Sequence, residues 1–185
     1  MDERERGAGL ILKTARLTLK PQQMGDAPAL FMILNDAEAM RFWSRPPITR
    51  LAVVEELVAE QLAAAAAGVC HYWTVLEGTD AIGSVDLSLV EDGSAELGFL
   101  FRRDRWGLGL ASEAAAAVAA HAMGGLGLKR LASAIQAENR AATRVLEKTG
   151  FALMDRRSVA IASGDIRDCA FYLLRRDQSA TANGR

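Results

Sequence analysis

A loop with the residue types of an anion site occupies residues 101–112, FRRDRWGLGLAS. Gly107 and Gly109 lack a Cβ, so the backbone there can turn sharply and a ligand can approach it closely. The N–H groups of residues 107–111 can converge on one point, and the following helix adds its unpaired N-terminal N–H groups and its dipole. Each charge-assisted hydrogen bond contributes about 1.5–3 kcal/mol, against at most ~2 kcal/mol for the dipole. The spacing therefore predicts a site for phosphate or another anion.

The two glycines are also compatible with a plain connection between a strand and a helix, because Gly-x-Gly alone is a weak signal. Two better-known phosphate loops do not match. No Gly-Lys-Ser/Thr is present, so the loop is not a Walker A motif, and the third glycine of a dinucleotide fingerprint is missing. A second glycine cluster, GGLGLK at 124–129, follows a predicted helix instead of preceding one, and we interpret it as a helix stop.

The spacing of apolar residues along the sequence predicts the strands and helices around this loop. Strand-like runs separated by turn residues occupy 17–19, 69–76, 81–90, 95–101, 131–135, 151–162 and 168–176. Helical stripes begin near residues 26 and 51, and further helices are expected at 112–123 and 141–148. This order predicts an α/β (α+β) fold with one mixed, mostly antiparallel sheet of seven strands, flanked by about four helices. The helix at 112–123 joins two strands by a crossover, so strands 95–101 and 131–135 should be parallel.

The composition narrows the class of protein. The 185 residues carry 22 Lys and Arg against 23 Asp and Glu, a formal net charge of −1, which argues against a nucleic-acid partner. Two cysteines and two histidines are too few for a disulfide framework or a Cys-rich zinc site, so no metal is predicted. No apolar run reaches the ~18 residues of a membrane span, and the charged start MDERERGAG is unlike a signal peptide. We therefore expect a cytoplasmic protein without a membrane partner.

The composition of the two ends predicts the domain boundaries. We expect residues 10–176 to form one domain, and the charged or small polar ends, 1–9 and 177–185, to be disordered. A homodimer is compatible with the sequence, which does not specify an oligomeric state.

Three stretches resemble the GNAT superfamily of N-acetyltransferases, and within it the RimJ/RimL type, which acetylates protein N-termini and other primary amines. LKTARLTLKPQQMGDAPALFMILND (12–36) is similar to the opening strand and helix of that branch. RDRWGLGLASEA (103–114) resembles its pyrophosphate loop, and AENRAATRVLEKTGF (137–151) resembles its Asn-x-x-Ser-x-x-hydrophobic-Leu-Glu-Lys-x-Gly-Phe segment. The match covers nearly the whole domain, roughly residues 12–176, and these three stretches carry it.

The resemblance implies acetyl-CoA as cosubstrate and a GNAT-type fold. It places the pyrophosphate on Trp106, Gly107, Leu108, Gly109, Leu110, Ala111 and Ser112, and the pantetheine arm along Phe99, Leu100 and Phe101. Asn139 would lie beside that arm, unless it serves only as a helix cap. Arg105, with Arg102 and Arg103, would attract the phosphates of the adenosine end, unless these arginines form a solvated face.

For catalysis, the leading candidate for the general base is Glu96, followed by Asp86 and then His71, although each could instead be a charge on a solvated sheet face. A backbone N–H near Leu100 would polarise the thioester carbonyl. The sequence departs from the family at the acid that protonates the leaving thiolate. The frequent Tyr and Ser positions hold Leu146 and Ala142.

The acceptor side is expected to involve the irregular segment 40–47, with Phe42, Trp43 and Tyr72 in contact with the substrate unless the first two only cover the core. Arg41 and Arg45 hint at an acidic acceptor. The function that fits best is an acetyl-CoA-dependent N-acetyltransferase in which a primary amine, on a protein N-terminus or a small molecule, attacks directly in a ternary complex. The alternative is a catalytically weak CoA-binding regulatory or interaction module. A nucleotide-binding enzyme is disfavoured by the absent Walker lysine.

Overall fold

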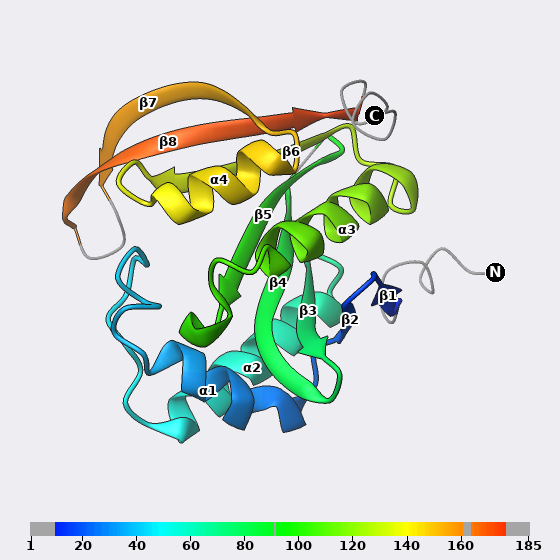
Figure 1. The fold of residues 1–185 in the computed structure, drawn as a ribbon, viewed down its shortest axis with the longest axis vertical. Coiled ribbons are helices and arrows are strands. Elements are labelled where there is room, and N and C mark those ends of the chain that lie inside the picture. The colour runs from blue at the N-terminus through cyan, green and yellow to red at the C-terminus, as the bar shows by residue number, and fades with distance from the viewer. Residues whose placement is uncertain (1–9, 91, 161–163, 177–185) are drawn as a thin grey trace.

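The computed structural model describes residues 10–90, 92–160 and 164–176, and Figure 1 shows the arrangement of its elements. In this part of the chain, eight strands form one sheet in the order β1-β2-β3-β4-β5-β6-β8-β7. The predicted disordered ends, 1–9 and 177–185, lie outside the described residues. The strands are β1 (Leu12–Lys13), β2 (Leu17–Pro21), β3 (Cys70–Glu77), β4 (Asp80–Val90), β5 (Ser94–Phe101), β6 (Arg130–Gln136), β7 (Ala152–Ala160) and β8 (Ile166–Arg175).

The predicted fold class is confirmed, with one more strand than the seven expected. The extra strand, β1, has two residues and is too short to show an alternating pattern. Every paired neighbour in the sheet is antiparallel except β5 and β6, which run parallel as the crossover predicted. Strands β7 and β8 form the expected final antiparallel pair.

Helices cover both faces of the sheet, as Figure 1 shows. Helices α1 (Ala27–Leu34) and α2 (Leu51–Ala66) enclose one apolar core, and α3 (Leu110–Gly124) and α4 (Arg140–Lys148) contribute to a larger core on the opposite face. Short 3-10 turns precede α1 and α3, namely η2 (Met24–Asp26) and η3 (Arg103–Arg105). Helix α3 begins at Leu110, two residues before the predicted start, so it follows the second glycine of the loop at once.

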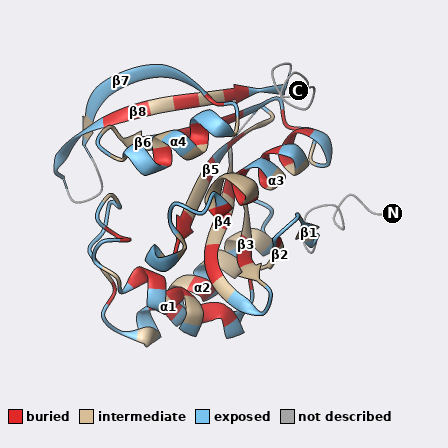
Figure 2. Cartoon of the chain, viewed as in Figure 1, coloured by how far each residue is buried: buried red, intermediate tan, exposed pale blue. Residues whose placement is uncertain are grey.

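Strand β5 contributes to both cores because successive side chains point to opposite faces. Leu97 and Phe101 lie in the larger core with α3, and Leu100 packs beneath α1 and α2. Figure 2 shows that buried residues gather on the central strands, whereas β7 at the sheet edge is almost entirely exposed. Residues on the central strands, or directly after them, are therefore held in place most firmly.

Helix α1 starts at a buried carboxylate that joins three elements. Lys20 Nζ lies 2.6 Å from both oxygens of Asp26, and Thr74 Oγ1 and the backbone N–H of Gln23 donate to Asp26 Oδ2 at 2.7 and 2.9 Å. Lys20 is on β2 and Thr74 on β3, so Asp26 fixes the start of α1 against the sheet.

We predict that Asp26→Ala destabilises the protein by about 3 kcal/mol, because it leaves a half-buried ammonium and two further donors without an acceptor. Chemical denaturation of both proteins measures this difference. Glu38→Ala is the control: its ion pair with Arg41 is exposed, with side-chain exposures of 49 and 58%, and its loss should cost at most about 0.5 kcal/mol. Equal costs for the two variants would contradict the structural role of Asp26.

Candidate active site

The glycine loop has the backbone geometry that the sequence predicted. Gly107 and Gly109 adopt φ angles of +76° and +78°, in the left-handed region that favours glycine. Within the described residues, the N–H groups of residues 107–112 donate no hydrogen bond to the protein, whereas the N–H of Trp106 donates to Arg103 O and that of Glu113 to Gly109 O. A row of free donors at the start of a 15-residue helix is suited to an anion.

Arg16, in the turn between β1 and β2, anchors this loop by hydrogen bonds. Its Nη1 donates to Leu108 O at 3.0 Å, and its Nε donates to Glu113 Oε2 at 2.7 Å. Thr14 Oγ1 donates to Glu113 Oε1 at 2.6 Å. Burial alone would raise the pKa of the Glu113 carboxyl, but the hydrogen bonds from Thr14 and Arg16 outweigh it and hold the pKa below its ordinary value. Glu113 is therefore a charged anchor for the first turn of α3.

The arginines of the loop are engaged in ion pairs. Arg105 contacts Glu77, Asp80 and Asp104 at 3.0, 3.4 and 2.8 Å. Arg102 contacts the same two aspartates, and Arg103 Nε lies 3.3 Å from Asp36 Oδ2. These pairs fasten η3 to the β3–β4 turn and offset the charge of the Arg105 guanidinium. The attraction of phosphates by Arg105 stays a prediction.

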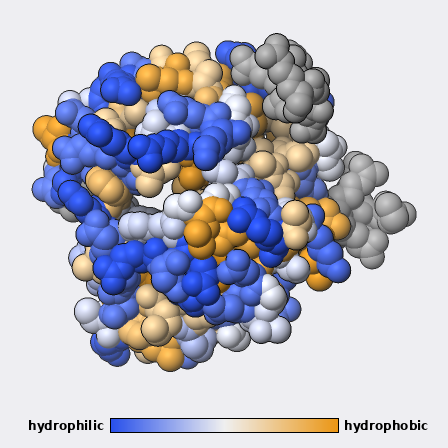
Figure 3. Space-filling view, viewed as in Figure 1, coloured by the Kyte–Doolittle hydropathy of each residue, from blue (hydrophilic) through white to orange (hydrophobic). Residues whose placement is uncertain are grey.

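Strands β5 and β6 separate immediately below the loop. They pair only where Ser94–Glu96 meets Arg130–Ala132. Beyond that point Ser133 Oγ donates to Leu97 O at 3.0 Å, and Trp106 Nε1 donates to Phe101 O at 2.9 Å. Figure 3 shows a hollow on this face, between α4 and the start of α3.

The alternation of β5 determines which backbone groups face this gap. Arg102 N donates to Ile82 O on β4, and Leu100 is paired with Ser84 on the same strand. Successive backbone groups of a strand point to opposite sides, so Phe99 and Phe101 face the gap and Leu100 faces β4. The backbone N–H of Leu100 itself is therefore directed to β4, and the N–H groups near Leu100 that face the gap are those of Phe99 and Phe101.

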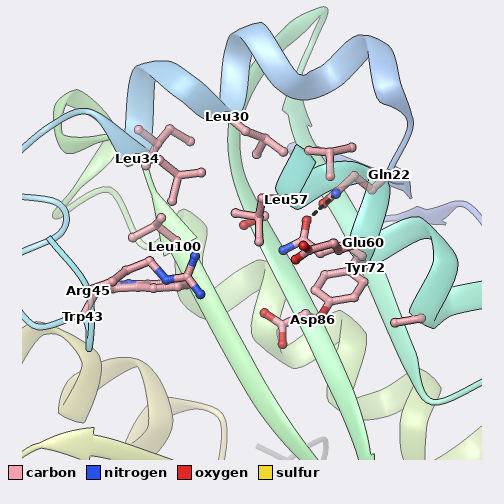
Figure 4. Close-up of a pocket in the computed structure, with 15 residues that line it drawn as sticks. Gln22, Leu30, Leu34, Trp43, Arg45, Leu57, Glu60, Tyr72, Asp86 and Leu100 are labelled. Atoms are coloured by element: carbon pink, nitrogen blue, oxygen red, sulfur yellow. Dashed lines mark hydrogen bonds between the residues drawn. The ribbon is translucent and has the colours of Figure 1, made fainter. Parts of the chain in front are cut away.

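A cavity of about 380 Å³ lies on the other side of β5, between α1, α2 and the sheet. Its walls are mostly apolar side chains from α1 and α2, together with Leu100 and Trp43. Figure 4 shows Tyr72 and Asp86 on the strands that form its floor, and Gln22, hydrogen-bonded to Gln61 at 2.6 Å, at one end. The predicted substrate contacts Trp43 and Tyr72 therefore line a cavity.

Phe42 does not line this cavity. Its carbonyl accepts a hydrogen bond from Gln136 Nε2 at 2.9 Å, and the guanidinium of Arg41 lies 5.2 Å from its ring centre. These contacts tie the segment after α1 to β6. Phe42 is thus attached to the end of β6, beside the gap, and does not contact the cavity.

Asp86 is the carboxylate on the cavity floor. Burial raises its pKa to about 6, and the neighbouring Glu96 carboxylate adds to the increase. The carboxylate fits because residue 98, opposite it on β5, is glycine: a Cβ there would lie 2.6 Å from Asp86 Oδ1. A carboxyl group that titrates near pH 6 can accept a proton from a substrate at neutral pH.

The other two base candidates are placed less well. Glu96 is exposed and does not line the cavity, although it is close enough to affect Asp86. His71 is on the opposite face of the sheet, where its ring lies 5.8 Å from that of Trp73, which in turn contacts His121 of α3. The geometry therefore favours Asp86 over Glu96 and separates His71 from the cavity.

The segment after β6 has a structural function. Asn139 Oδ1 accepts a hydrogen bond from Ala142 N at 3.1 Å and caps α4. Leu146 and Ala142, at the positions where the family frequently has hydroxyl groups, are buried in the structure. The cap occupies the oxygen of Asn139, and its amide nitrogen donates no hydrogen bond to the described residues, so a ligand contact remains a prediction.

Polar residues on α2, and Gln22 directly after β2, have no role among the predictions made from the sequence. Glu60 and Gln61 line the cavity beside Leu57 and Ala64. The i, i+3, i+4, i+7 spacing places these positions on one helix face. A polar pair within that otherwise apolar face was the signal available in the sequence.

The profile of the acetyltransferase (GNAT) domain matches residues 16–152, which include the loop, the gap and the cavity. The chain belongs to the GNAT acetyltransferase family. It is therefore an acetyltransferase enzyme, as the resemblance predicted.

Individual relatives agree with this family assignment. The chain is 26% identical over 144 residues to a Bacillus licheniformis protein called "Uncharacterized N-acetyltransferase p20", covering 76% of this chain and 81% of the relative. Spermidine N-acetyltransferase from Vibrio cholerae, solved with CoA and spermine, has a TM-score of 0.79 at 19% identity and covers 91% of this chain and all of its own. RimL, a ribosomal L7/L12 α-N-protein acetyltransferase solved with CoA, has a TM-score of 0.81 at 18% identity and covers 90 and 98%. At these identities the structures show the shared GNAT fold.

In the described ranges, no helix is long and apolar enough to cross a membrane. The same residues contain no group of three or more His, Cys, Asp and Glu side chains arranged to hold a metal ion.

We predict that Asp86 titrates near pH 6 and that Glu96→Gln lowers this midpoint, because the substitution removes a neighbouring negative charge that favours the protonated form. Carbon-detected NMR of the side-chain carboxyl groups measures the midpoint. Glu60→Gln is the matched control, since Glu60 lines the same cavity but does not perturb Asp86. An Asp86 midpoint near 4 in the unmodified protein would contradict the burial of this carboxyl group.

Proposed function

We propose that this GNAT enzyme transfers the acetyl group of acetyl-CoA to a primary amine that binds in the cavity, by direct attack in a ternary complex. The observation that supports this most strongly is the position of β5. One edge of the strand faces the gap below the row of free N–H donors, and one face lines a cavity with a titratable carboxylate. The two ligands of an acetyl transfer can therefore meet at this strand.

The loop fits the diphosphate of CoA by its donor set. The N–H groups of residues 107–112 have no partner within the described chain, and the two left-handed glycines keep side chains away from them. Trp106, whose ring N–H donates a hydrogen bond to Phe101 O, closes one side of the loop. Arg105 stays a predicted phosphate contact beside this set, with its charge offset by three carboxylates.

The gap between β5 and β6 is suited to the pantetheine arm. Phe99 and Phe101 present their backbone groups there, and Asn139 begins the helix on the far side. When bound, acetyl-CoA supplies the thioester: the C–N bond to the amine forms, the C–S bond breaks and CoA leaves. The N–H of Phe99, next to Leu100, is the donor that we assign to carbonyl polarisation.

Asp86 accepts the proton that the amine releases. It lies on the cavity floor, and its raised pKa matches a base that works near neutral pH. Glu96, the first candidate from the sequence, would act on Asp86 through its charge. Tyr72, opposite Asp86 on β3, lines the same cavity. Burial, followed by its hydrogen bond with Cys70, raises the Tyr72 pKa, so the phenol keeps its proton and can donate a hydrogen bond.

The departing thiolate needs no acid from α4, because a thiol is a far better leaving group than an alcohol. Leu146 and Ala142 offer no hydroxyl there, and these two residues are the reason to keep the alternative of a CoA-binding module without turnover. Since the fold resembles both the RimL and the spermidine enzyme, the acceptor includes protein N-termini and small amines in this proposal, and the site of action is the cytoplasm.

We expect calorimetry to show acetyl-CoA binding, and Gly109→Val to weaken it by more than tenfold, because a branched side chain would cover the donors of the loop. Gly68→Val is the matched control. Gly68 also has a positive φ, +74°, with open space around its Cβ position, but it follows α2 far from the loop. It should cost stability and leave CoA affinity unchanged. Equal affinity in the Gly109 variant would overturn the loop assignment.

We expect kcat/KM to fall as the pH drops through about 6, because Asp86 must be deprotonated to act as a base. Thiol release in the presence of a primary amine measures this limb, which lies well below the pKa of an ordinary alkylamine. Asp86→Asn should reduce kcat by at least ~100-fold, whereas Glu96→Gln should retain turnover and move the limb to lower pH. The reverse pattern would make Glu96 the base. Binding of acetyl-CoA without turnover of any amine would favour the non-catalytic alternative.

A further inference from the structure

The cavity holds three charged side chains without ion-pair partners. In the described part of the chain, the side chains of Arg45, Glu60 and Asp86 form no salt bridge within 4.0 Å and no hydrogen bond. This contrasts with the arginines of the glycine loop, all of which are paired. Arg45 and Glu60 are exposed and Asp86 is half-buried, so all three charges are accessible to a ligand that carries the opposite charges.

The positions of these charges separate the cavity into two ends. Figure 4 shows Arg45 with Trp43 on the side of Leu34 and Leu100, whereas Glu60, Tyr72 and Gln22 lie on the other side. Asp86 is on the floor, directly opposite Tyr72 on the neighbouring strand. The space between the two ends of the cavity is bounded by leucine, isoleucine and valine side chains of α1 and α2. An occupant must therefore be apolar in its middle and polar at its ends.

We infer that the acceptor is an amine that also carries an anionic group, joined to it by an apolar segment. Its amine faces Asp86 and Glu60, and its anionic group faces the guanidinium of Arg45. The inference rests on the proposed function and deepens it by naming the class of acceptor.

The charge pattern favours this class over a diamine or polyamine. A second ammonium group extending toward Arg45 would meet a like charge. An amine with an uncharged tail would forgo a charge-assisted hydrogen bond from the exposed guanidinium. The reverse orientation is opposed as well, since a carboxylate beside Glu60 and Asp86 would be repelled. One bound orientation then places the nitrogen beside the base, which direct attack requires.

The test compares acceptors that differ only in the anionic group. Thiol release from acetyl-CoA is measured with 6-aminohexanoate, hexylamine and 1,6-diaminohexane. A second arm uses the tripeptide amides Ala-Asp-Ala and Ala-Asn-Ala, because a peptide N-terminus with an acidic side chain presents the same chemistry. We expect kcat/KM at least tenfold higher for the carboxylate-bearing member of at least one arm, which corresponds to about 1.4 kcal/mol. The arm that shows it distinguishes a free amino acid from a peptide.

Arg45→Met should reduce that preference to less than twofold. Arg41→Met is the matched control: Arg41 is on the same segment but outside the cavity, where it pairs with Glu38, so its replacement should preserve the preference. Ratios below twofold in every arm of the unmodified enzyme, or a faster reaction with the diamine, would overturn the inference while leaving acetyl transfer intact.

Calorimetry on the CoA-bound protein keeps the two proposals distinguishable. If no amine accepts an acetyl group, the proposed function fails, and binding of the same probes decides the inference by itself. Tighter binding of a carboxylate-bearing probe that depends on Arg45 would support it. Equal binding of both members of every pair, or binding unaffected by Arg45→Met, would overturn it.

Discussion

The constraint on which this site depends is that β5 and β6 stop pairing after Glu96 and Ala132. Two parallel strands that stayed together would satisfy their backbone groups and leave no opening between them. Because they diverge, β5 has one edge bonded to β4 and one edge directed into a gap. The Ser133 hydroxyl satisfies Leu97 O at the point of divergence. The same strand thus serves the loop at its end, the gap along its edge and the cavity on its face.

The two halves of the site treat charge in opposite ways. At the glycine loop, the arginines are neutralised by carboxylates, and the free groups are backbone N–H donors on a rigid helix start. In the cavity, the backbone is paired within the sheet, and the free groups are side chains. A fixed set of backbone donors suits a ligand part that is always the same. Side chains that can be exchanged without disturbing the sheet suit a part that differs among members of a family.

Local sequence signals predicted most of the framework. The glycine spacing, the turn residues between β3, β4 and β5, and the crossover rule were sufficient for the loop, the hairpins and the parallel pair. What they could not supply was the register. That Gly98, and no larger residue, faces Asp86 depends on how β4 and β5 align, and the preference for Asp86 over Glu96 follows from it. The parity of β5, which turns Leu100 away from the gap, and the partners of Arg105 likewise depend on tertiary contacts between distant segments.

The bonds from Thr14 and Arg16 to Glu113 and Leu108 span between 92 and 99 positions of sequence. Closing a loop of that length costs conformational entropy before any contact compensates for it. A chain still emerging from the ribosome, with the first hairpin made and α3 not yet synthesised, has no anchor for the glycine segment. The glycine loop that we propose as the diphosphate site therefore reaches its final arrangement late in folding, and binding of CoA there would report that the two ends of this stretch have already met.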